Sequence, residues 1–381
     1  MKPIIIGAGI GGLAASIAMR RAGIEPVLYE QAGDLSKMQV GAGLGIWHNA
    51  MRVLQRLGLG DQILAIAPTV STFEGWSWKG EKLAVWPVKE MGERLGAPTV
   101  GMSRQDLYAV LLDAVPRDSI HTSARCVGFE QDADTVTARF ADGSTAQADV
   151  LIGADGLNSS IRAQLLGRDP PRYAGYTVWR AQVDYQADDV PTGAFLTIWG
   201  RGQRFIFYFV RPGRIYWLAV RNAEPGGQDD PARIKDELVT AYRGWMAPVE
   251  AIIAATPSEA IHRTDIQDRA PVDRWGQGRV TLLGDAAHPM TFNVGQGAGQ
   301  AIEDGFVLTN CLREEPVPER ALRRYESKRM KRTAAMTNLA WRMGLLGRWK
   351  NPIACSFRNR LMKAMNSKAM RAHEHDMAVE L

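Results

Sequence analysis

The chain has 381 residues and a formal net charge of +5, and its 46% hydrophobic content argues for a large buried core and against an intrinsically disordered protein. Its three cysteines, Cys126, Cys311 and Cys355, form no C-x-x-C pair, which favours a reducing, cytoplasmic location and argues against a disulfide framework or a zinc site. We expect no metal and no transmembrane helix, because the histidines lack metal-ligand spacing and no apolar run reaches about 18 residues.

Residues 2–30 have the pattern of a strand, a glycine-rich turn, a helix and a second strand. An acid that ends the second strand lies about 20 residues beyond the turn, the spacing at which a carboxylate meets a ribose hydroxyl pair. The pattern therefore predicts dinucleotide binding without choosing between NAD and FAD, and the alternative is a tight strand-to-helix turn. The candidate cofactor-binding residues here are Gly7, Gly9, Gly11, Gly12 and Glu30.

A second glycine-rich stretch, residues 41–46, includes Gly43 and leads into a predicted helix. His48 is interpreted first as a residue of that helix start and only secondarily as a catalytic base. Residues 75–79, Gly-Trp-Ser-Trp-Lys, superficially resemble a halogenase motif, but the alternation favours a hairpin strand with packing tryptophans. Arg104 begins another predicted helix, where a surface arginine is the simplest interpretation.

Residues 125–131 and 135–140 alternate like strands, and Asp142-Gly143 after them predicts a hairpin turn. Residues 150–152 form a further buried strand. Gly153-Ala154-Asp155-Gly156 follows that strand. Residues 173–221 are rich in aromatic and β-branched residues and predict an inserted β-sheet. Pro231 suits the first position of a helix that we expect over residues 232–245.

Residues 280–304 predict a buried strand, a turn and a helix. Gly284-Asp285 ends the strand, so the Asp285 carboxylate would emerge where open α/β sheets place their ligands. Gly295-Gln296-Gly297 follows, and the missing Cβ atoms would let backbone N–H groups at a helix start approach a flat ring. A capping aspartate in an ordinary strand, loop and helix is the alternative.

The chain beyond Pro316 is predicted to be helical and basic. A solvated basic face packed on the cofactor domain is the favoured interpretation, and the alternative is contact with a membrane surface or an acidic partner. Nucleic acid is not expected, because no binding motif accompanies the charge. His373 and His375 lie in a polar tail, where we expect both to be exposed.

The order of these motifs resembles the class A flavoprotein monooxygenases, the 4-hydroxybenzoate hydroxylase-like family, and within it the urate hydroxylase and zeaxanthin epoxidase branch. The resemblance covers nearly the whole chain, and its most specific part is Gly-Asp-Ala-Ala-His, then Pro, then Gly-Gln-Gly, in residues 284–297. Phe292 replaces a proline that is usual in the family. Asn293 stands where urate hydroxylases carry aspartate, which disfavours urate as the substrate.

The resemblance implies an α/β fold, with a Rossmann-like FAD-binding domain, an inserted β-sheet substrate domain and C-terminal helices. It also implies that Arg104 and Asp155 contact FAD, and that Arg204 and Tyr216 are the substrate-pocket residues. The implied segments are FAD-binding parts at 1–72, 101–171 and 269–330, substrate-domain strands at 73–100, a substrate sheet at 172–268 and basic helices at 331–381.

The implied activity is a monooxygenase reaction. FAD would be reduced by transient NADH or NADPH, and O2 would form a flavin C4a-hydroperoxide that hydroxylates or epoxidises an electron-rich aromatic, heteroaromatic or alkene small molecule. Two alternatives stay open: a flavin oxidase or reductase on the same fold, and a catalytically silent FAD-binding interaction protein. The sequence leaves the substrate, the nicotinamide cofactor and the choice of monomer or homodimer open.

Overall fold

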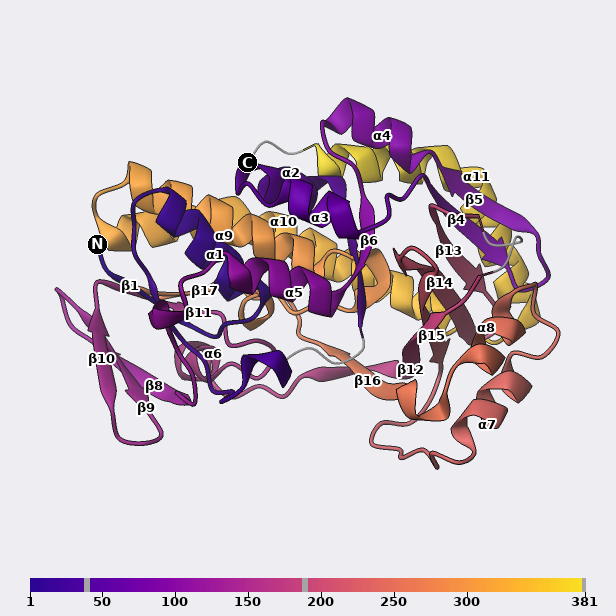
Figure 1. Cartoon of the computed structure of the whole chain (residues 1–381), viewed down its shortest axis with the longest axis horizontal. Coiled ribbons are helices and arrows are strands. Elements are labelled where there is room, and N and C mark those ends of the chain that lie inside the picture. The colour runs from indigo at the N-terminus through magenta and orange to yellow at the C-terminus, as the bar shows by residue number, and fades with distance from the viewer. Residues whose placement is uncertain (38–41, 187–190, 379–381) are drawn as a thin grey trace.

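The computed structural model describes residues 1–37, 42–186 and 191–378, and it contains two main sheets at opposite ends of the molecule with helices around them (Figure 1). Gly41, in the second glycine-rich stretch, lies outside the described residues. Within the described ranges, no helix is both long and apolar enough to cross a membrane.

The first sheet has five strands in the order β17-β11-β1-β2-β7, and every neighbouring pair is parallel. The strands are β1 (Pro3–Ile6), β2 (Val27–Tyr29), β7 (Ile120–His121), β11 (Val150–Gly153) and β17 (Val280–Leu282). Every residue of β1, β11 and β17 is buried, as expected for parallel strands covered on both faces.

Helices and a small antiparallel sheet cover the two faces of this parallel sheet (Figure 1). The elements on the helical side are α1 (Ile10–Arg21), α5 (Arg104–Asp113), α9 (Gly297–Glu314) and α10 (Pro318–Gly347). Those on the other side are β8 (Cys126–Gln131), β9 (Val136–Phe140), β10 (Thr145–Ala148) and α6 (Ser160–Leu166). Buried residues of all these layers form one core.

The second sheet has seven strands in the order β16-β12-β15-β14-β13-β4-β5. The strands are β4 (Thr72–Ser77), β5 (Lys82–Trp86), β12 (Arg172–Asp184), β13 (Ala194–Trp199), β14 (Gln203–Arg211), β15 (Arg214–Arg221) and β16 (His262–Asp268). All neighbours are antiparallel except β13 and β4. The tryptophans of residues 75–79 lie in or beside the β4–β5 hairpin, as the alternation predicted.

The seven-stranded sheet buries both faces in different cores, because side chains alternate along each strand. On the outer face, Phe205, Phe207 and Trp217 pack in a core shared with α7 (Ile234–Ala241) and α8 (Val249–Ala255). Burying each such side chain stabilises the fold by about 1.5–3 kcal/mol. The inner face carries Tyr208 and Tyr216 and packs against Phe292 and Trp341. The inner face is therefore the one turned toward the glycine-rich turns.

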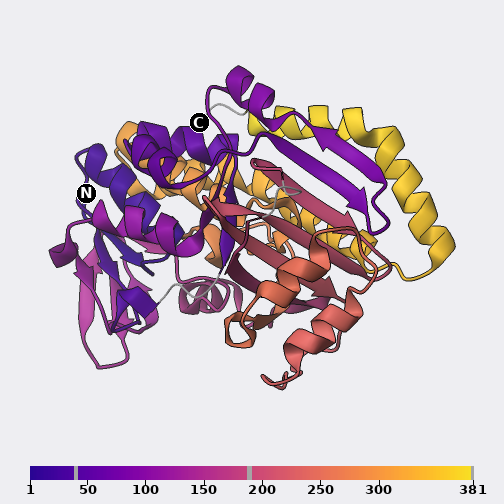
Figure 2. The same ribbon diagram turned by 45° about the vertical axis from the view of Figure 1, so that its right-hand side comes forward.

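A two-stranded sheet, β3 (Gly43–Ile46) and β6 (Val100–Ser103), lies between the two main sheets (Figure 1). The remaining helices are α2 (His48–Arg56), α3 (Gly60–Ile66), α4 (Val88–Leu95) and α11 (Pro352–Met377). Figure 2 shows α11, in yellow, along the outer edge of the molecule. The segment boundaries predicted from the sequence stay a prediction.

Two local expectations are wrong. Residues 231–233 form a turn, so Pro231 is not the first residue of α7, which begins at Ile234 and ends at Ala241. His373 is not in an exposed tail, because α11 brings its imidazole against Trp47, with ring centroids 4.6 Å apart. Burial there lowers the pKa of His373 to about 3, whereas His375 is exposed as expected.

Candidate functional site

Three of the predicted glycine-containing turns follow neighbouring strands of the parallel sheet. Ile6 at the end of β1 is in register with Gly153 of β11, and Gly153 is in register with Leu282 of β17. The three turns that follow therefore begin at the same edge of the sheet. Ligands of open α/β sheets bind at this carboxyl edge.

The glycines of the first turn have two different surroundings. At Gly7, Gly11 and Gly12, an added Cβ would clash with protein atoms of the strand ends or the turn itself. At Gly9, an added Cβ would meet no protein atom within 4 Å. Gly9 is also the N-cap of α1, and no side chain caps that helix. Open space in front of uncapped helix N–H groups fits a pyrophosphate.

Glu30 is a buried carboxylate that fixes the first turn. Its Oε2 accepts a hydrogen bond from the Ala8 N–H at 2.9 Å, and its Oε1 accepts one from the Ala32 N–H at 2.8 Å. Each carboxylate oxygen has a second lone pair, so these bonds leave acceptor capacity for ribose hydroxyls.

The two motif aspartates follow β11 and β17. Asp155 Oδ2 accepts bonds from the Ser160 N–H at 2.8 Å and the Ser160 hydroxyl at 3.1 Å, whereas Asp155 Oδ1 is buried without a partner among the described residues. Asp285 is exposed and follows Gly284, whose φ of +60° lies in the left-handed region that favours glycine. Both aspartates therefore present a free acceptor at the sheet edge.

The remaining two glycine-rich stretches meet each other. An added Cβ on Gly295 would lie 2.9 Å from Trp47 Nε1, and Gln296 Oε1 accepts a hydrogen bond from Asn49 Nδ2 at 3.0 Å. Gly297 begins α9, and its added Cβ would meet no protein atom closer than 3.9 Å. The start of α9 therefore has open space in front of it, as the start of α1 does at Gly9.

Gly43 begins β3 and Arg104 follows the last residue of β6, so both lie at the same end of the two-stranded sheet. Gly43 pairs with Ser103, and the Arg104 N–H donates to the Ala42 carbonyl at 2.8 Å. The ring of Tyr216 lies directly against Gly43, where a Cβ would collide with it. The Arg104 side chain is exposed. The structure thus brings Tyr216 to Gly43 and leaves the Arg104 guanidinium outside the packed residues.

Arg204 is a buried cation held by aromatic rings. It is 3% exposed, and its Cζ lies 5.2 Å from the ring centroid of Trp199 and 5.5 Å from that of Tyr176. Burial lowers the pKa of the guanidinium, and the neighbours that raise it are the phenols of Tyr176 and Tyr242, with no carboxylate among the described residues. Arg204 is therefore a desolvated cation without an anionic partner among the described residues.

Tyr216 shares the inner face with Arg204 but lies elsewhere on it. Arg204 pairs with Val220, four residues along β15 from Tyr216, which corresponds to about 13 Å. Burial raises the pKa of Tyr216, and the opposing effects of Arg180 and the Gly43 N–H are smaller. Tyr216 is therefore a neutral phenol at physiological pH.

Asn293 joins the inner face of the sheet to α10. Its Nδ2 contacts the Tyr176 hydroxyl at 2.7 Å and the Ala340 carbonyl at 2.9 Å. Asn293 Oδ1 is buried and accepts no hydrogen bond from the described residues. Gly344 and Gly347 let α10 pass close to this group, because a Cβ on either would lie within 3 Å of Asn293, Tyr176 or Arg204 atoms.

A buried network of charged side chains is hydrogen-bonded to the Gly284-Asp285 turn. Asp304 Oδ2 accepts from the Gly284 N–H at 3.0 Å and contacts His288 Nε2 at 2.6 Å. Arg329 Nε donates to Asp304 Oδ1 at 2.6 Å, and its Nη1 pairs with Glu303 at 2.5 Å. Sequence reasoning missed this network. The available signal was two adjacent acids, Glu303 and Asp304, in residues 299–308, a stretch that is otherwise apolar apart from Gln300.

The lowered pKa of the Asp304 carboxyl makes the stability of the fold depend on pH in the acid range. Charge and hydrogen-bond interactions with His288 and Arg329 outweigh desolvation and lower its pKa to about 2, from an ordinary 3.8. A depressed folded pKa stabilises the fold above the unfolded value and loses that contribution as pH falls from near 3.8 toward 2.

We expect urea unfolding to show a stability difference between the unmodified protein and Asp304→Asn that shrinks over this pH window. The matched control is Asp113→Asn, because Asp113 lies in an exposed ion pair with Arg117. A difference that is constant from about pH 5 to about pH 2 would contradict the assignment.

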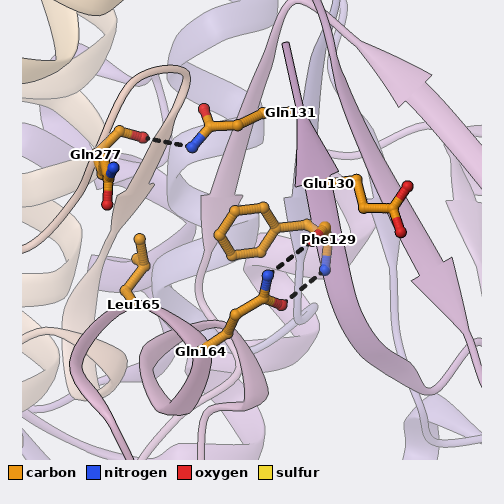
Figure 3. Close-up of a pocket in the computed structure, with 6 residues that line it drawn as sticks. All are labelled: Phe129, Glu130, Gln131, Gln164, Leu165 and Gln277. Carbon is orange, nitrogen blue, oxygen red and sulfur yellow. Dashed lines mark hydrogen bonds between the residues drawn. The ribbon is translucent and has the colours of Figure 1, made fainter.

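A separate pocket of about 370 Å³ lies beside the small antiparallel sheet and does not share these features. Figure 3 shows that the Gln164 side chain makes two hydrogen bonds to the Phe129 backbone, and that Gln131 donates to the Gln277 carbonyl. The side-chain amides of Gln164 and Gln131 are thus occupied by structural bonds, and the glycine-rich turns do not line this pocket.

Comparison with known proteins identifies the family. Residues 1–340 match the family model described as FAD binding domain. The chain is 41% identical to the aurachin C monooxygenase/isomerase of Stigmatella aurantiaca, over 96% of this chain and 94% of that protein. It is 36% identical to the FAD-dependent urate hydroxylase of Klebsiella pneumoniae, over 87% and 86% of the two chains. The chain belongs to the class A FAD-dependent monooxygenases.

The same relationship holds in three dimensions. The structure of Klebsiella pneumoniae HpxO complexed with FAD and uric acid has a TM-score of 0.92 to this monooxygenase at 31% identity, over 99% of this chain and 96% of that one. The predictions of an FAD-binding α/β fold, an inserted sheet and an FAD-dependent hydroxylase are confirmed.

His48 is the first residue of α2, as expected, and its Nδ1 lies 2.8 Å from the Ala97 carbonyl.

Proposed function

We propose that this monooxygenase hydroxylates an electron-rich aromatic or heteroaromatic ring that carries an anionic or enolic oxygen, bound between FAD and the inner face of the seven-stranded sheet. The observation that carries the proposal is Arg204, which is a buried guanidinium without a carboxylate partner among the described residues. An uncompensated buried cation is costly, so an anionic oxygen of the substrate would supply the missing charge.

We propose that FAD lies along the edge where the glycine-rich turns meet. Its proposed contacts are Gly7, Gly9, Gly11, Gly12, Glu30, Gly43, Arg104, Asp155, Gly284, Asp285, Gly295, Gln296 and Gly297. The open space at Gly9 and the unpaired Asp155 Oδ1 support this arrangement. When bound, FAD accepts electrons from NADH or NADPH and activates O2 for transfer of one oxygen atom.

The chain's own residues would then position the ring and exclude water. Arg204 would orient the anionic oxygen, and the unpaired Asn293 Oδ1 would accept a hydrogen bond from a ring N–H or hydroxyl. Tyr216 would hold the Gly43 backbone in place and remain protonated, since burial raises its pKa. An amide at position 293 cannot act as a base, so the substrate would have to arrive already ionised or enolised.

The ring systems named for the relatives support a compact heteroaromatic or hydroxylated aromatic substrate. Relatives at 33–36% identity include urate, 3-amino-4-hydroxybenzoate and 6-hydroxynicotinate hydroxylating enzymes. The substrate named for each of these enzymes carries an acidic or enolic oxygen on its ring system. A cytoplasmic location and a monomer or homodimer remain part of this proposal.

The test compares Arg204→Ala with Arg201→Ala across a panel of hydroxylated aromatic and heteroaromatic acids. Arg201 lies three residues away and is exposed, so its substitution is the matched control. Losing a hydrogen bond to a charged group costs about 1.5–3 kcal/mol, so we expect KM to rise roughly 10-fold to 150-fold in Arg204→Ala.

The same variant should keep its FAD and lose coupling, with reducing equivalents appearing as hydrogen peroxide. Product formed per NAD(P)H consumed is the measurement, alongside thermal melts of the holoprotein. A lower melting temperature with unchanged KM and coupling would mean that Arg204 stabilises the sheet, and it would remove Arg204 from the substrate site.

A further inference from the structure

The helix α11 has a packed side and an open side. Its packed side includes Cys355 and Arg358, and Arg358 Nη2 donates to the Gly200 carbonyl at 3.0 Å. The open side faces away from the rest of the molecule along the outer edge seen in Figure 2. An ordinary surface helix places polar residues on that side.

The open side of α11 instead carries a row of apolar side chains. Ile353 is 80% exposed, Phe357 61%, Leu361 41% and Met365 41%. A spacing of four residues puts them one above another on a helix. Single exposed apolar residues are common on soluble proteins, but four in a continuous row form a patch of the kind that marks an interaction site.

Basic residues accompany this apolar row. Arg360, Lys368 and Arg371 are exposed, and residues 352–373 contain no aspartate or glutamate. Helical geometry places these three cations on the same outward half of the helix as Ile353 and Phe357. The open face of α11 thus combines apolar side chains with charged side chains that are all basic.

The basic residues of α10 and those on the open side of α11 have different surroundings. Arg329 and Arg332 of α10 are used inside the protein, where they pair with Glu303. The side chains of the cations on the open side of α11 form no ion pair or hydrogen bond with the residues that the structure describes. The intramolecular role favoured from the sequence is consistent with these α10 ion pairs, and for the open face of α11 it stays a prediction.

We propose that the open face of α11 docks on an anionic lipid surface, with the apolar row at the boundary of headgroups and acyl chains. Two copies of the chain are a poorer occupant, since pairing this face with itself would bring cations together without any acid in the face. An amphipathic helix with an apolar row and Lys or Arg beside it is the pattern of peripheral membrane contact. This inference does not depend on the proposed substrate.

The test is co-sedimentation of the full-length holoprotein with vesicles of phosphatidylcholine mixed with phosphatidylglycerol, or of phosphatidylcholine alone, at low and high salt. We expect binding to the anionic vesicles only, reversed by salt. Arg360→Gln/Lys368→Gln/Arg371→Gln should weaken partitioning by about fivefold per cation, or roughly 100-fold in total. Ile353→Ser/Phe357→Ser should weaken it by at least about tenfold.

The matched control is Val127→Ser, because Val127 is 54% exposed on β8, at the opposite end of the molecule. It should partition like the unmodified protein. Three results would overturn the proposal: no sedimentation with anionic vesicles at low salt, equal binding by all variants, or a dimer in analytical ultracentrifugation that Ile353→Ser/Phe357→Ser abolishes. Thermal melts of each variant show that the fold is retained.

Discussion

Gly9→Val is expected to give a folded protein that is purified without its yellow cofactor. An added Cβ at Gly9 meets no protein atom within 4 Å, and the backbone there is extended, with φ −71° and ψ −177°, which valine adopts readily. The new side chain would fill the space in front of the α1 N–H groups, where the FAD pyrophosphate is proposed to bind. We expect FAD affinity to fall at least about 100-fold, or about 2.8 kcal/mol.

FAD titration of the apoprotein followed by flavin fluorescence measures this loss, and thermal melts of the apoprotein measure the fold. Gly12→Ala is the contrasting variant, because its Cβ would collide with the Gly7 carbonyl and lower the apoprotein melting temperature. Asp285→Ala should lower FAD affinity by about 1.5–3 kcal/mol, the free energy of a hydrogen bond to a charged group. Full FAD occupancy in Gly9→Val would refute the proposed cofactor position.

The glycine-rich turns could be predicted because their information is local. Gly7 to Gly12, the helix after them and Glu30 lie within 24 residues, and each follows from backbone sterics or strand length. The β4–β5 hairpin and the Asp142-Gly143 turn were predicted for the same reason. Short-range rules are sufficient where the partners of a residue are its sequence neighbours.

Long-range partners could not be predicted in the same way. The sequence shows six basic residues between 323 and 332, but only the packing of α10 on α9 decides that Arg329 turns inward. His373 was expected to be exposed because its sequence neighbours are polar, yet α11 returns it to Trp47, 326 residues earlier in the chain. Tyr176 and Asn293 meet because residues 292–294 pack against the inner face of the seven-stranded sheet. No local pattern in either segment predicts their contact.

Arg329→Met is expected to destabilise the fold strongly. Arg329 is 2% exposed and is the cation shared by Glu303 and Asp304, whose side chains are both 0% exposed. Removing one partner of a buried ion pair leaves an uncompensated charge and costs about 3–5 kcal/mol. Arg332 still pairs with Glu303 at 3.0 Å, so Asp304 is the carboxylate that loses its only guanidinium partner among the described residues and keeps its contacts with His288 and the Gly284 N–H.

Lys328→Met is the matched control, because Lys328 precedes Arg329 on α10 and is exposed; we expect it to change the free energy of unfolding by no more than about 0.5 kcal/mol. Arg329→Lys should recover only part of the loss, since an ammonium cannot reproduce the bonds that the guanidinium makes to two carboxylates and to Gln300. Urea unfolding of the three variants gives the comparison.

Arg329→Met should also weaken FAD binding by the molecules that remain folded. Asp304 Oδ2 accepts the Gly284 N–H and contacts His288, so an unpaired Asp304 would take up a proton or shift, and the turn that presents Asp285 would lose its anchor. Adding Asp304→Asn to Arg329→Met should restore part of the unfolding free energy, because the buried charge is then removed together with its partner. If the double variant is no more stable than Arg329→Met alone, the loss comes from packing of the arginine side chain and not from the unpaired carboxylate.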